Sequence, residues 1–229
     1  MDRHRRAGMR VVDWRRVRAV SFDVGGTLIA PWPSVGHVYA RVAQEFGLSA
    51  APELLNRQFR RAWQNRQAFA HSRLAWQQLV NQAFRGLCPT PLPDPVFDAL
   101  YEAFGRASSW RIFPDVLPTL RALCTRGIEL VVVSNWDERL RPLLDELKLA
   151  PFFKGIVISC EVGFPKPAPE IFAAAQAQLS LPRETLLHLG DSRDEDVDGA
   201  RRSGWQALHL RRDQNSSSSD VIHSLEEIL

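Results

Sequence analysis

The feature that most constrains the fold is an alternation of short apolar runs with amphipathic helical segments through the second half of the chain. Apolar runs of strand length that lack polar alternation are typical of a parallel sheet covered by helices on both faces. The sequence therefore predicts an α/β fold with a doubly wound, Rossmann-like parallel sheet. The expected strands are 18–23, 128–134, 155–159, 186–190 and 206–210, and the expected helices are 115–127, 137–147, 169–179 and 194–204.

Residues 31–107 break this alternation because their apolar residues recur with a helical period. Val35, Val38, Tyr39 and Val42 follow the spacing of one helix face, and similar stripes recur further along the segment. We therefore expect about four helices here, inserted directly after the first strand. The predicted organisation is an α/β core from residues 18–30 and 108–229, with an all-helical cap domain over residues 31–107.

The basic charge is concentrated at the start of the chain. Residues 1–18 hold seven arginines against two aspartates, a net charge of +5, which leaves −2 of the formal +3 for the rest. We interpret residues 1–17 as a basic N-terminal extension, expected to be a solvated arm because it lacks the apolar core of a signal peptide. The slightly acidic remainder argues against nucleic-acid binding.

Apolar runs and cysteines bound the cellular setting. The longest clear apolar run, 128–133, has the length of a strand, so no membrane span is predicted. The three cysteines, which are odd in number and far apart in the chain, are predicted to be reduced core residues. A cytoplasmic protein is expected.

Polar residues follow three of the predicted strands. Asp23, Ser134 and Asp191 each stand where an apolar run ends. Ligands of open parallel sheets bind beyond the carboxyl ends of the strands. These three side chains therefore indicate a ligand site at that edge of the sheet.

Four short segments occur in a recognisable order: "FDVGGTL" (22–28), "VVSN" (132–135), "GFPKPAPEIF" (163–172) and "GDSRDEDVDGA" (190–200). Their order and spacing resemble the haloacid dehalogenase superfamily of hydrolases, in the branch with a helical cap inserted after the first motif (type C1). The turns "SNWD" and "GFPKPAPEIF" also resemble the group named after a rhythmically expressed fly protein.

The resemblance implies a Mg²⁺-dependent phosphoryl-transfer site. Asp23 would be the nucleophile, because an ionised carboxylate forms a mixed anhydride that water can hydrolyse. Lys166 would neutralise the nucleophile and the phosphoryl oxygens. The metal would be held by Asp23, by the backbone carbonyl of Gly25 and by Asp191, with Asp196 behind them orienting a bound water or Lys166.

Phosphate binding is assigned by the same resemblance to Ser134, the backbone N–H of Asn135 and Thr27. Local alternatives remain for each site residue. Ser134 and Asp137 also match a capping box at a helix start, and Thr27 could steady its own turn. Lys166 could be an ordinary exposed loop lysine, and the aspartate of the first motif could cap a turn.

Gly25 departs from the family pattern, which has a second aspartate two residues after the nucleophile. Glycine still offers a backbone carbonyl, but it cannot protonate the leaving group or activate water. General acid–base catalysis is typically worth about 10²–10⁴-fold. We therefore expect slow attack on alkyl phosphates, with aryl and acyl phosphates least affected.

The sequence thus predicts a phosphatase acting on a small phosphorylated molecule, and it leaves two alternatives. A metal- and phosphate-binding protein without catalysis is compatible with Gly25. A metal-free haloacid dehalogenase is less favoured because the "GD" of the metal motif is present, and a cap lysine for phosphonate hydrolysis is lacking in residues 29–112. One predicted helix carries basic residues near Trp63 that form either a solvated face or contacts to an anionic substrate: Arg57, Arg60, Arg61 and Arg66.

Overall fold

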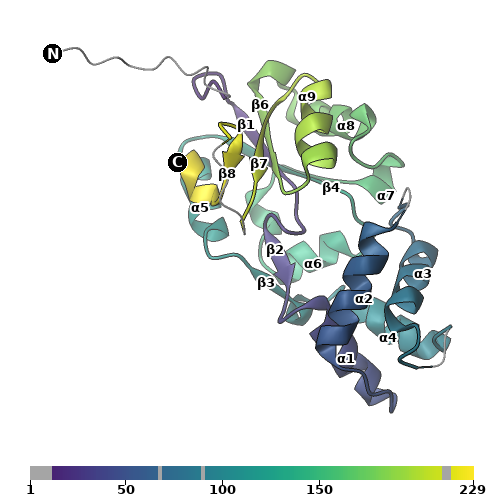
Figure 1. The fold of residues 1–229 in the computed structure, drawn as a ribbon. Coiled ribbons are helices and arrows are strands. Elements are labelled where there is room, and N and C mark those ends of the chain that lie inside the picture. The colour runs from purple at the N-terminus through teal and green to yellow at the C-terminus, as the bar shows by residue number, and fades with distance from the viewer. Residues whose placement is uncertain (1–11, 67–68, 89–90, 213–217) are drawn as a thin grey trace.

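The computed structural model describes residues 12–66, 69–88, 91–212 and 218–229. Within them, six strands form one parallel sheet, which confirms the predicted α/β class (Figure 1). In their order across the sheet the strands are β5 (Gly155–Ile158), β4 (Glu129–Ser134), β1 (Ala19–Phe22), β6 (Leu186–Gly190), β7 (Gln206–Leu210) and β8 (Val221–Ile222).

Helices cover both faces of the sheet. Alternate residues of β4 point to opposite faces, so Leu130 packs in one hydrophobic cluster with α5 and α6, and Val131 packs in another with α8 and α9. Both faces of the sheet are therefore buried. The flanking helices are α5 (Val116–Thr125), α6 (Leu140–Glu146), α7 (Ser159–Val162), α8 (Pro169–Leu179) and α9 (Gly199–Arg202). Shorter turns are η1 (Ala107–Ser109), η2 (Ala150–Phe152), η3 (Arg183–Thr185), the π-helical η4 (Arg193–Asp198) and η5 (Leu225–Ile228).

Among the described residues, four helices between β2 and β3 form what we call the helical insertion. They pack around a hydrophobic cluster of their own, separate from the two clusters of the sheet. Ser34 and Ser72 cap the first and third helices by accepting hydrogen bonds from the backbone N–H groups of His37 and Ala75. The helices are α1 (Val35–Glu45), α2 (Pro52–Gln64), α3 (Arg73–Phe84) and α4 (Asp94–Ala103).

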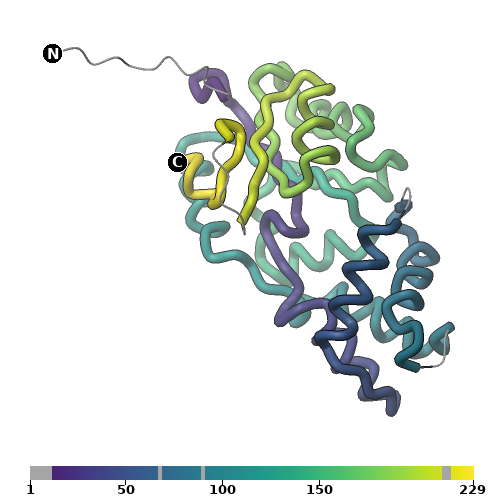
Figure 2. Tube along the Cα trace, in the orientation of Figure 1, coloured from purple at the N-terminus to yellow at the C-terminus, as the bar shows by residue number. Residues whose placement is uncertain are grey.

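The chain enters and leaves the helical insertion through a two-stranded antiparallel ribbon. Strands β2 (Ile29–Pro31) and β3 (Trp110–Ile112) pair residue for residue, so the two crossings lie side by side (Figure 2). The sequence did not predict this ribbon. The pairing holds the helical insertion beside the carboxyl end of β1.

Several local expectations were wrong. Residues 12–17 are not a solvated arm, because Val12 and Val17 are buried in the core; residues 1–11 lie outside the described residues. The predicted core cysteines are exposed at Cys124 and Cys160 and half-buried at Cys88.

No helix in the described part of the chain is both long and apolar enough to cross a membrane.

Candidate active site

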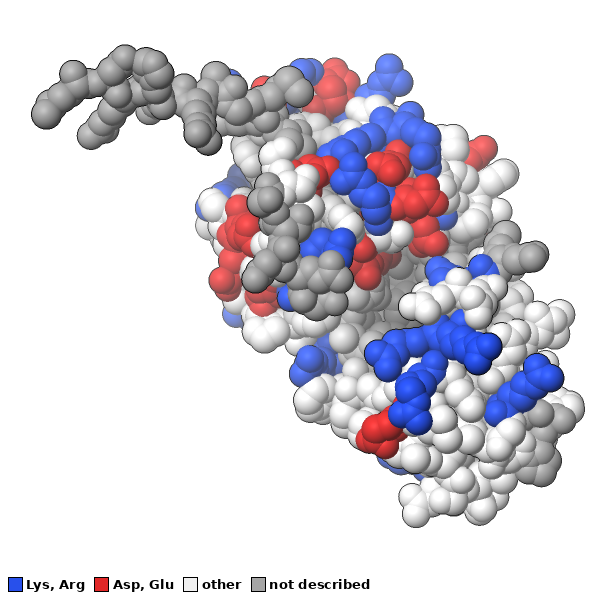
Figure 3. Space-filling view, viewed as in Figure 1, with Lys and Arg blue, Asp and Glu red and all other residues white. Residues whose placement is uncertain are grey.

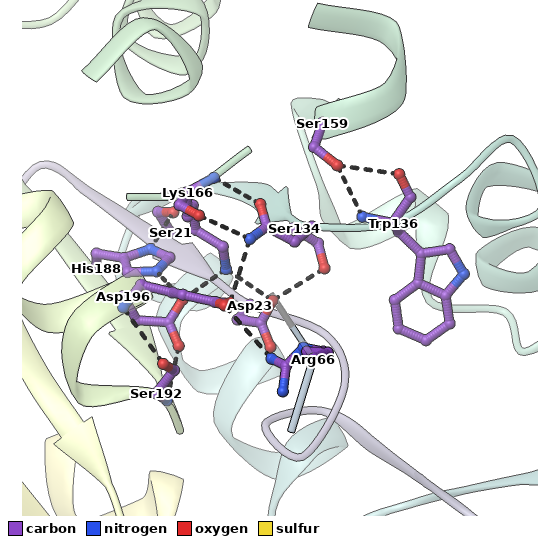
Figure 4. Close-up of polar contacts among 12 residues, drawn as sticks. Ser21, Asp23, Arg66, Ser134, Trp136, Ser159, Lys166, His188, Ser192 and Asp196 are labelled. Carbon is purple, nitrogen blue, oxygen red and sulfur yellow. Dashed lines mark hydrogen bonds and ion pairs between the residues drawn. The ribbon is translucent and has the colours of Figure 1, made fainter. Parts of the chain in front are cut away.

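Residues that follow three parallel strands come together at one edge of the sheet. Asp23 follows β1, Ser134 ends β4, and Asp191 follows β6. Because β1 lies between β4 and β6, these strand ends are neighbours. Lys166 reaches them from the loop between α7 and α8. The structure therefore gathers four of the predicted site residues, and Figure 4 shows Asp23 with Ser134 and Lys166.

The Asp23 carboxylate is held by two donors on one oxygen. Ser134 Oγ donates to Asp23 Oδ1 at 2.9 Å, and Lys166 Nζ donates to the same oxygen at 2.8 Å. None of the described residues donates a hydrogen bond to Asp23 Oδ2, and the side chain is 11% exposed. A carboxylate oriented in this way has one oxygen available for nucleophilic attack or for a metal.

A second buried carboxylate, Asp196, accepts hydrogen bonds on both of its oxygens. Lys166 Nζ donates to Asp196 Oδ1 at 2.5 Å, and His188 Nε2 lies 3.1 Å from that oxygen. The Ser192 N–H donates to Asp196 Oδ2 at 2.9 Å. Ser21 Oγ lies 2.7 Å from His188 Nδ1, so both ring nitrogens of the histidine are engaged. Asp196 and His188 thus fix the position of the Lys166 ammonium (Figure 4).

The charges of this group are strongly coupled. Burial alone would lower the pKa of Lys166, but the charges of Asp196 and Asp23 raise it above its ordinary value. Burial opposes the ionisation of Asp196, yet the Lys166 ammonium holds the pKa of that carboxyl below its usual range. Burial raises the pKa of Asp23, and the charge of Asp196 adds to this while Lys166 opposes it. Lys166 is therefore a fixed cation, and its charge only partly offsets the effects of burial and of Asp196 on the pKa of Asp23.

Asp191 differs from the other two aspartates because its side chain is exposed to the cavity. Loss of bulk water around the carboxylate, together with the charges of Asp23 and Asp196, raises the pKa of Asp191 to about 8. Its carboxylate rests against Gly26, where a Cβ atom would lie 2.8 Å from Asp191 Cγ. Ligand oxygens of the three aspartates lie within 4.8 Å of one another. Hard carboxylate donors grouped in this way fit a Mg²⁺ ion.

The remaining predicted residues are placed differently from one another. Gly25 lines the cavity, and a Cβ atom there would lie 3.2 Å from Trp136 Cζ3. Asn135 also lines the cavity, but its side chain holds the Lys166 loop: Oδ1 accepts from the Lys166 N–H at 2.6 Å, and Nδ2 donates to the Lys166 carbonyl at 2.9 Å. Thr27 is buried away from the cavity lining, and its hydroxyl has no hydrogen-bond partner among the described residues.

The alternative interpretation of Ser134 as a helix cap is wrong. Helix α6 begins at Leu140, several residues later than predicted, so Asn135 does not stand at a helix start. Ser134 donates to the aspartate of the first motif, and Asp137 accepts from the Arg139 N–H at 3.1 Å. The predicted Ser134–Asp137 capping box therefore does not form.

A cavity of about 590 Å³ lies between the strand ends and the helical insertion, and Figure 3 shows the molecule hollowed there. Arg66 links the two sides, because its Nη2 lies 3.7 Å from Glu195 Oε1 while Glu195 Oε2 accepts from Asn135 Nδ2 at 3.2 Å. The guanidinium of Arg66 also lies 3.6 Å from the centroid of the Trp63 ring. The other basic residues of α2 are exposed as a solvated face: Arg57, Arg60 and Arg61.

Three contributors to the site were not among the predicted site residues. His188 is a lone polar residue inside the apolar run 186–190, and this was the signal that could have identified it. Glu195 and Trp136 gave no such signal, because their roles depend on contacts with residues far away in the sequence. The site is therefore larger than its motifs.

Residues 17–204 match the family model for haloacid dehalogenase-like hydrolases. The haloacid dehalogenase-like hydrolase domain-containing protein 3 of Bos taurus is 32% identical over 204 residues, which are 84% of this chain and 81% of that protein. The glyceraldehyde 3-phosphate phosphatase of Methanopyrus kandleri is 36% identical over 106 residues, which are 44% of this chain and 43% of that protein.

The fold has solved counterparts. The HAD-hydrolase YfnB from Bacillus subtilis, bound to magnesium, has a TM-score of 0.76 at 18% identity, covering 93% of this chain and 97% of that one. At this identity the likeness concerns the fold alone. The match of residues 17–204 and the relative at 32% identity go further, and they show that the chain belongs to the haloacid dehalogenase-like hydrolases.

Proposed function

We propose that the protein is a Mg²⁺-dependent phosphatase that transfers a phosphoryl group to Asp23 and then to water. The observation that supports this most is the Asp23 carboxylate itself, with one oxygen held by Ser134 and Lys166 and the other without a hydrogen bond from any described residue. The site lies in a cavity large enough for a small phosphorylated molecule.

Asp23, the Gly25 carbonyl and Asp191 would hold the metal. The cluster fits a divalent cation because the three carboxylates, once ionised, would carry two negative charges more than the single ammonium of Lys166 balances. Asp196 belongs to the cluster by distance, but both of its oxygens already accept hydrogen bonds, so we assign it to positioning. When bound, Mg²⁺ would stabilise negative charge on the phosphoryl oxygens.

The first chemical step would be attack of Asp23 on the phosphorus atom of the substrate. The Asp23 carboxylate forms a bond to phosphorus, and the bond between phosphorus and the leaving oxygen breaks with its electron pair. Ser134 and Lys166 orient the attacking carboxylate, and the Lys166 cation offsets charge on the phosphoryl group. In the second step water attacks the aspartyl phosphate and regenerates the carboxylate.

Gly25 sets the expected weakness of this chemistry. Without an acid at that position, the leaving oxygen departs unprotonated, and water attacks without a base from that residue. Aryl and acyl phosphates should therefore be turned over faster than alkyl phosphates. The helical insertion, which walls the cavity, would act as a cap that excludes bulk water when substrate is bound.

The test is phosphate release from acetyl phosphate and p-nitrophenyl phosphate, with and without Mg²⁺. We expect turnover that needs the metal and is lost in Asp23→Asn, a substitution that removes the charge and keeps the side chain nearly the same size. The matched control is Asp194→Asn, because Asp194 is an exposed aspartate of the same acidic segment. Tight Mg²⁺ and phosphate binding without turnover in the parent would instead support a non-catalytic binding protein.

A further inference from the structure

Aromatic rings form most of the wall opposite the reacting carboxylate. They come from all four helices of the insertion, from β3 and from the loop after β4. This wall reaches down to Asp23 and Gly25, which line the same cavity. The rings that carry the argument are Tyr39, Phe59, Trp63, Trp76, Trp110 and Trp136.

These rings support one another. Phe59 and Trp63 stack at 6.0 Å between centroids with planes 15° apart, and Trp63 and Trp76 stack at 5.8 Å with planes 14° apart. Trp110 lies 5.2 Å from Trp136 on the other side. Rings held in register by their neighbours form a rigid apolar wall, and such a wall packs favourably against another flat ring, face to face or edge to face.

Trp136 brings the aromatic wall to the reacting centre. Its backbone N–H donates to Ser159 Oγ at 3.1 Å, and its carbonyl accepts from the same hydroxyl at 3.1 Å, which fixes the residue (Figure 4). A Cβ at Gly25 would lie 3.2 Å from the indole. The family acid at this position meets the leaving group, so the benzene edge of the Trp136 indole would lie beside the leaving group here.

Polar groups on the wall are mostly engaged already. Arg139 donates to Asp137 and to the Tyr101 carbonyl, and the Tyr101 hydroxyl donates to Glu138 at 2.8 Å. Arg66 donates to the Trp63 carbonyl at 2.6 Å. A sugar or glycerol leaving group would bury hydroxyls without partners, and each would lower affinity on the order of tenfold.

Three side-chain nitrogens of residues on this wall are buried and lack hydrogen-bond partners among the described residues. They are His71 Nδ1, Trp76 Nε1 and Trp136 Nε1. Because these nitrogens are buried, they do not offer accessible partners to a chain of hydroxyls. The wall therefore selects for an apolar, planar group.

The chemistry of the leaving group points to the same class of substrate, one with an aromatic ring. Without an acid at Gly25 the leaving oxygen departs as an anion, and a phenol ionises at a pKa of about 10, far more readily than an aliphatic alcohol. We propose that the substrate is a small phosphomonoester of an aromatic alcohol, a refinement that rests on the proposed phosphatase function. The bond from Asp23 to phosphorus forms as the phosphorus–aryloxide bond breaks, and the aryloxide then takes a proton from solvent.

The test compares 2-naphthyl phosphate with phenyl phosphate, whose leaving groups have similar basicity and differ in ring area. We expect kcat/KM to be about tenfold higher for the naphthyl ester, and Trp63→Leu to bring this ratio close to one. Trp32→Leu, an exposed tryptophan away from the cavity, should leave the ratio unchanged. A ratio near one in the parent, or a ratio that Trp63→Leu does not change, would overturn the proposal.

Two further experiments distinguish a failure of the aromatic-substrate proposal from a failure of the proposed phosphatase function. Acetyl phosphate has no ring, so its Mg²⁺-dependent turnover tests phosphatase chemistry alone. Asp23→Asn should still bind 2-naphthyl phosphate about tenfold more tightly than phenyl phosphate, and equal affinities would sink the aromatic site even if turnover is absent. A phosphotyrosine peptide should be a poorer substrate than phenyl phosphate, and a better one would exclude a small-molecule site.

Discussion

Gly26 is expected to control metal binding through the side chain that rests on it. Its φ of +78° lies in the left-handed region, so Gly26→Ala should cost about 1–2 kcal/mol from backbone strain alone. The new Cβ would also lie 2.8 Å from Asp191 Cγ, well inside van der Waals contact. The Asp191 carboxylate must therefore move. Because loss of groups that merely support metal ligands costs about 10–100-fold in affinity, displacing a ligand should cost at least about 100-fold.

The chain offers a matched control for the backbone term. Gly47 has a φ of +74°, and a Cβ there would meet no atom within 4 Å. Thermal unfolding should lower the Tm of both variants by a similar amount, about 2–4 °C for each kcal/mol in a chain of this size. Calorimetric titration with Mg²⁺ should show weakened binding only in Gly26→Ala.

One outcome would refute this reasoning. If Gly26→Ala binds Mg²⁺ as tightly as Gly47→Ala, the contact with Asp191 does not control the site. Asp191→Asn then separates the causes: lost binding in that variant would mean that the turn yields, and retained binding would mean that Asp191 is not a ligand.

Three other perturbations follow from the same geometry. Asp191→Asn should weaken Mg²⁺ binding by at least about 100-fold, and Asp196→Asn by about tenfold, the lower end of the range for a supporting group. Asp194→Asn is the exposed control, and equal losses for Asp191→Asn and Asp196→Asn in calorimetric titration would contradict the positioning role of Asp196. Gly25→Asp should raise kcat/KM for glycerol 3-phosphate only a little while Trp136 is present, because the new Cβ would lie 3.2 Å from the indole. Adding Trp136→Ala should raise kcat/KM by up to about 10²–10⁴-fold. Identical gains in the single and double variants would argue against a fixed indole. Burial lowers the pKa of His71 from 6.5 to about 4, so between these pH values the unfolded chain binds a proton at His71 and the folded chain does not. The free energy of unfolding should therefore fall as pH drops from 6.5 towards 4, by up to about 3 kcal/mol relative to His71→Asn in urea titrations. Parallel pH curves for the two proteins would disprove this.

The sheet could be predicted because its strands are continuous apolar runs separated by helices of clear period. That pattern also placed Asp23, Ser134 and Asp191 at neighbouring strand ends, where the structure has them. The ribbon of β2 and β3 escaped prediction because each strand has only three residues and depends on pairing with a segment far along the chain.

Contacts between distant segments account for most of what the sequence could not predict. The approach of Trp136 to Gly25 and the link from Glu195 to Asn135 depend on how separate loops meet at the sheet edge. The capping box at Ser134 was a plausible local motif, but a hydrogen bond to the aspartate after β1 replaced it. Val17 was masked by the arginines around it, although the core buries it.

Detection of a phosphoryl group on Asp23 tests the central claim most directly. The protein would be mixed with acetyl phosphate and Mg²⁺, quenched in acid within seconds, and mapped by peptide mass spectrometry. We expect an adduct on Asp23 that accumulates because Gly25 provides no base for its hydrolysis, that hydroxylamine removes, and that is absent with a chelator or in Asp23→Asn. Phosphate release without an Asp23 adduct, persisting in Asp23→Asn, would contradict the mechanism, and binding of Mg²⁺ and phosphate without adduct or release would identify a binding protein.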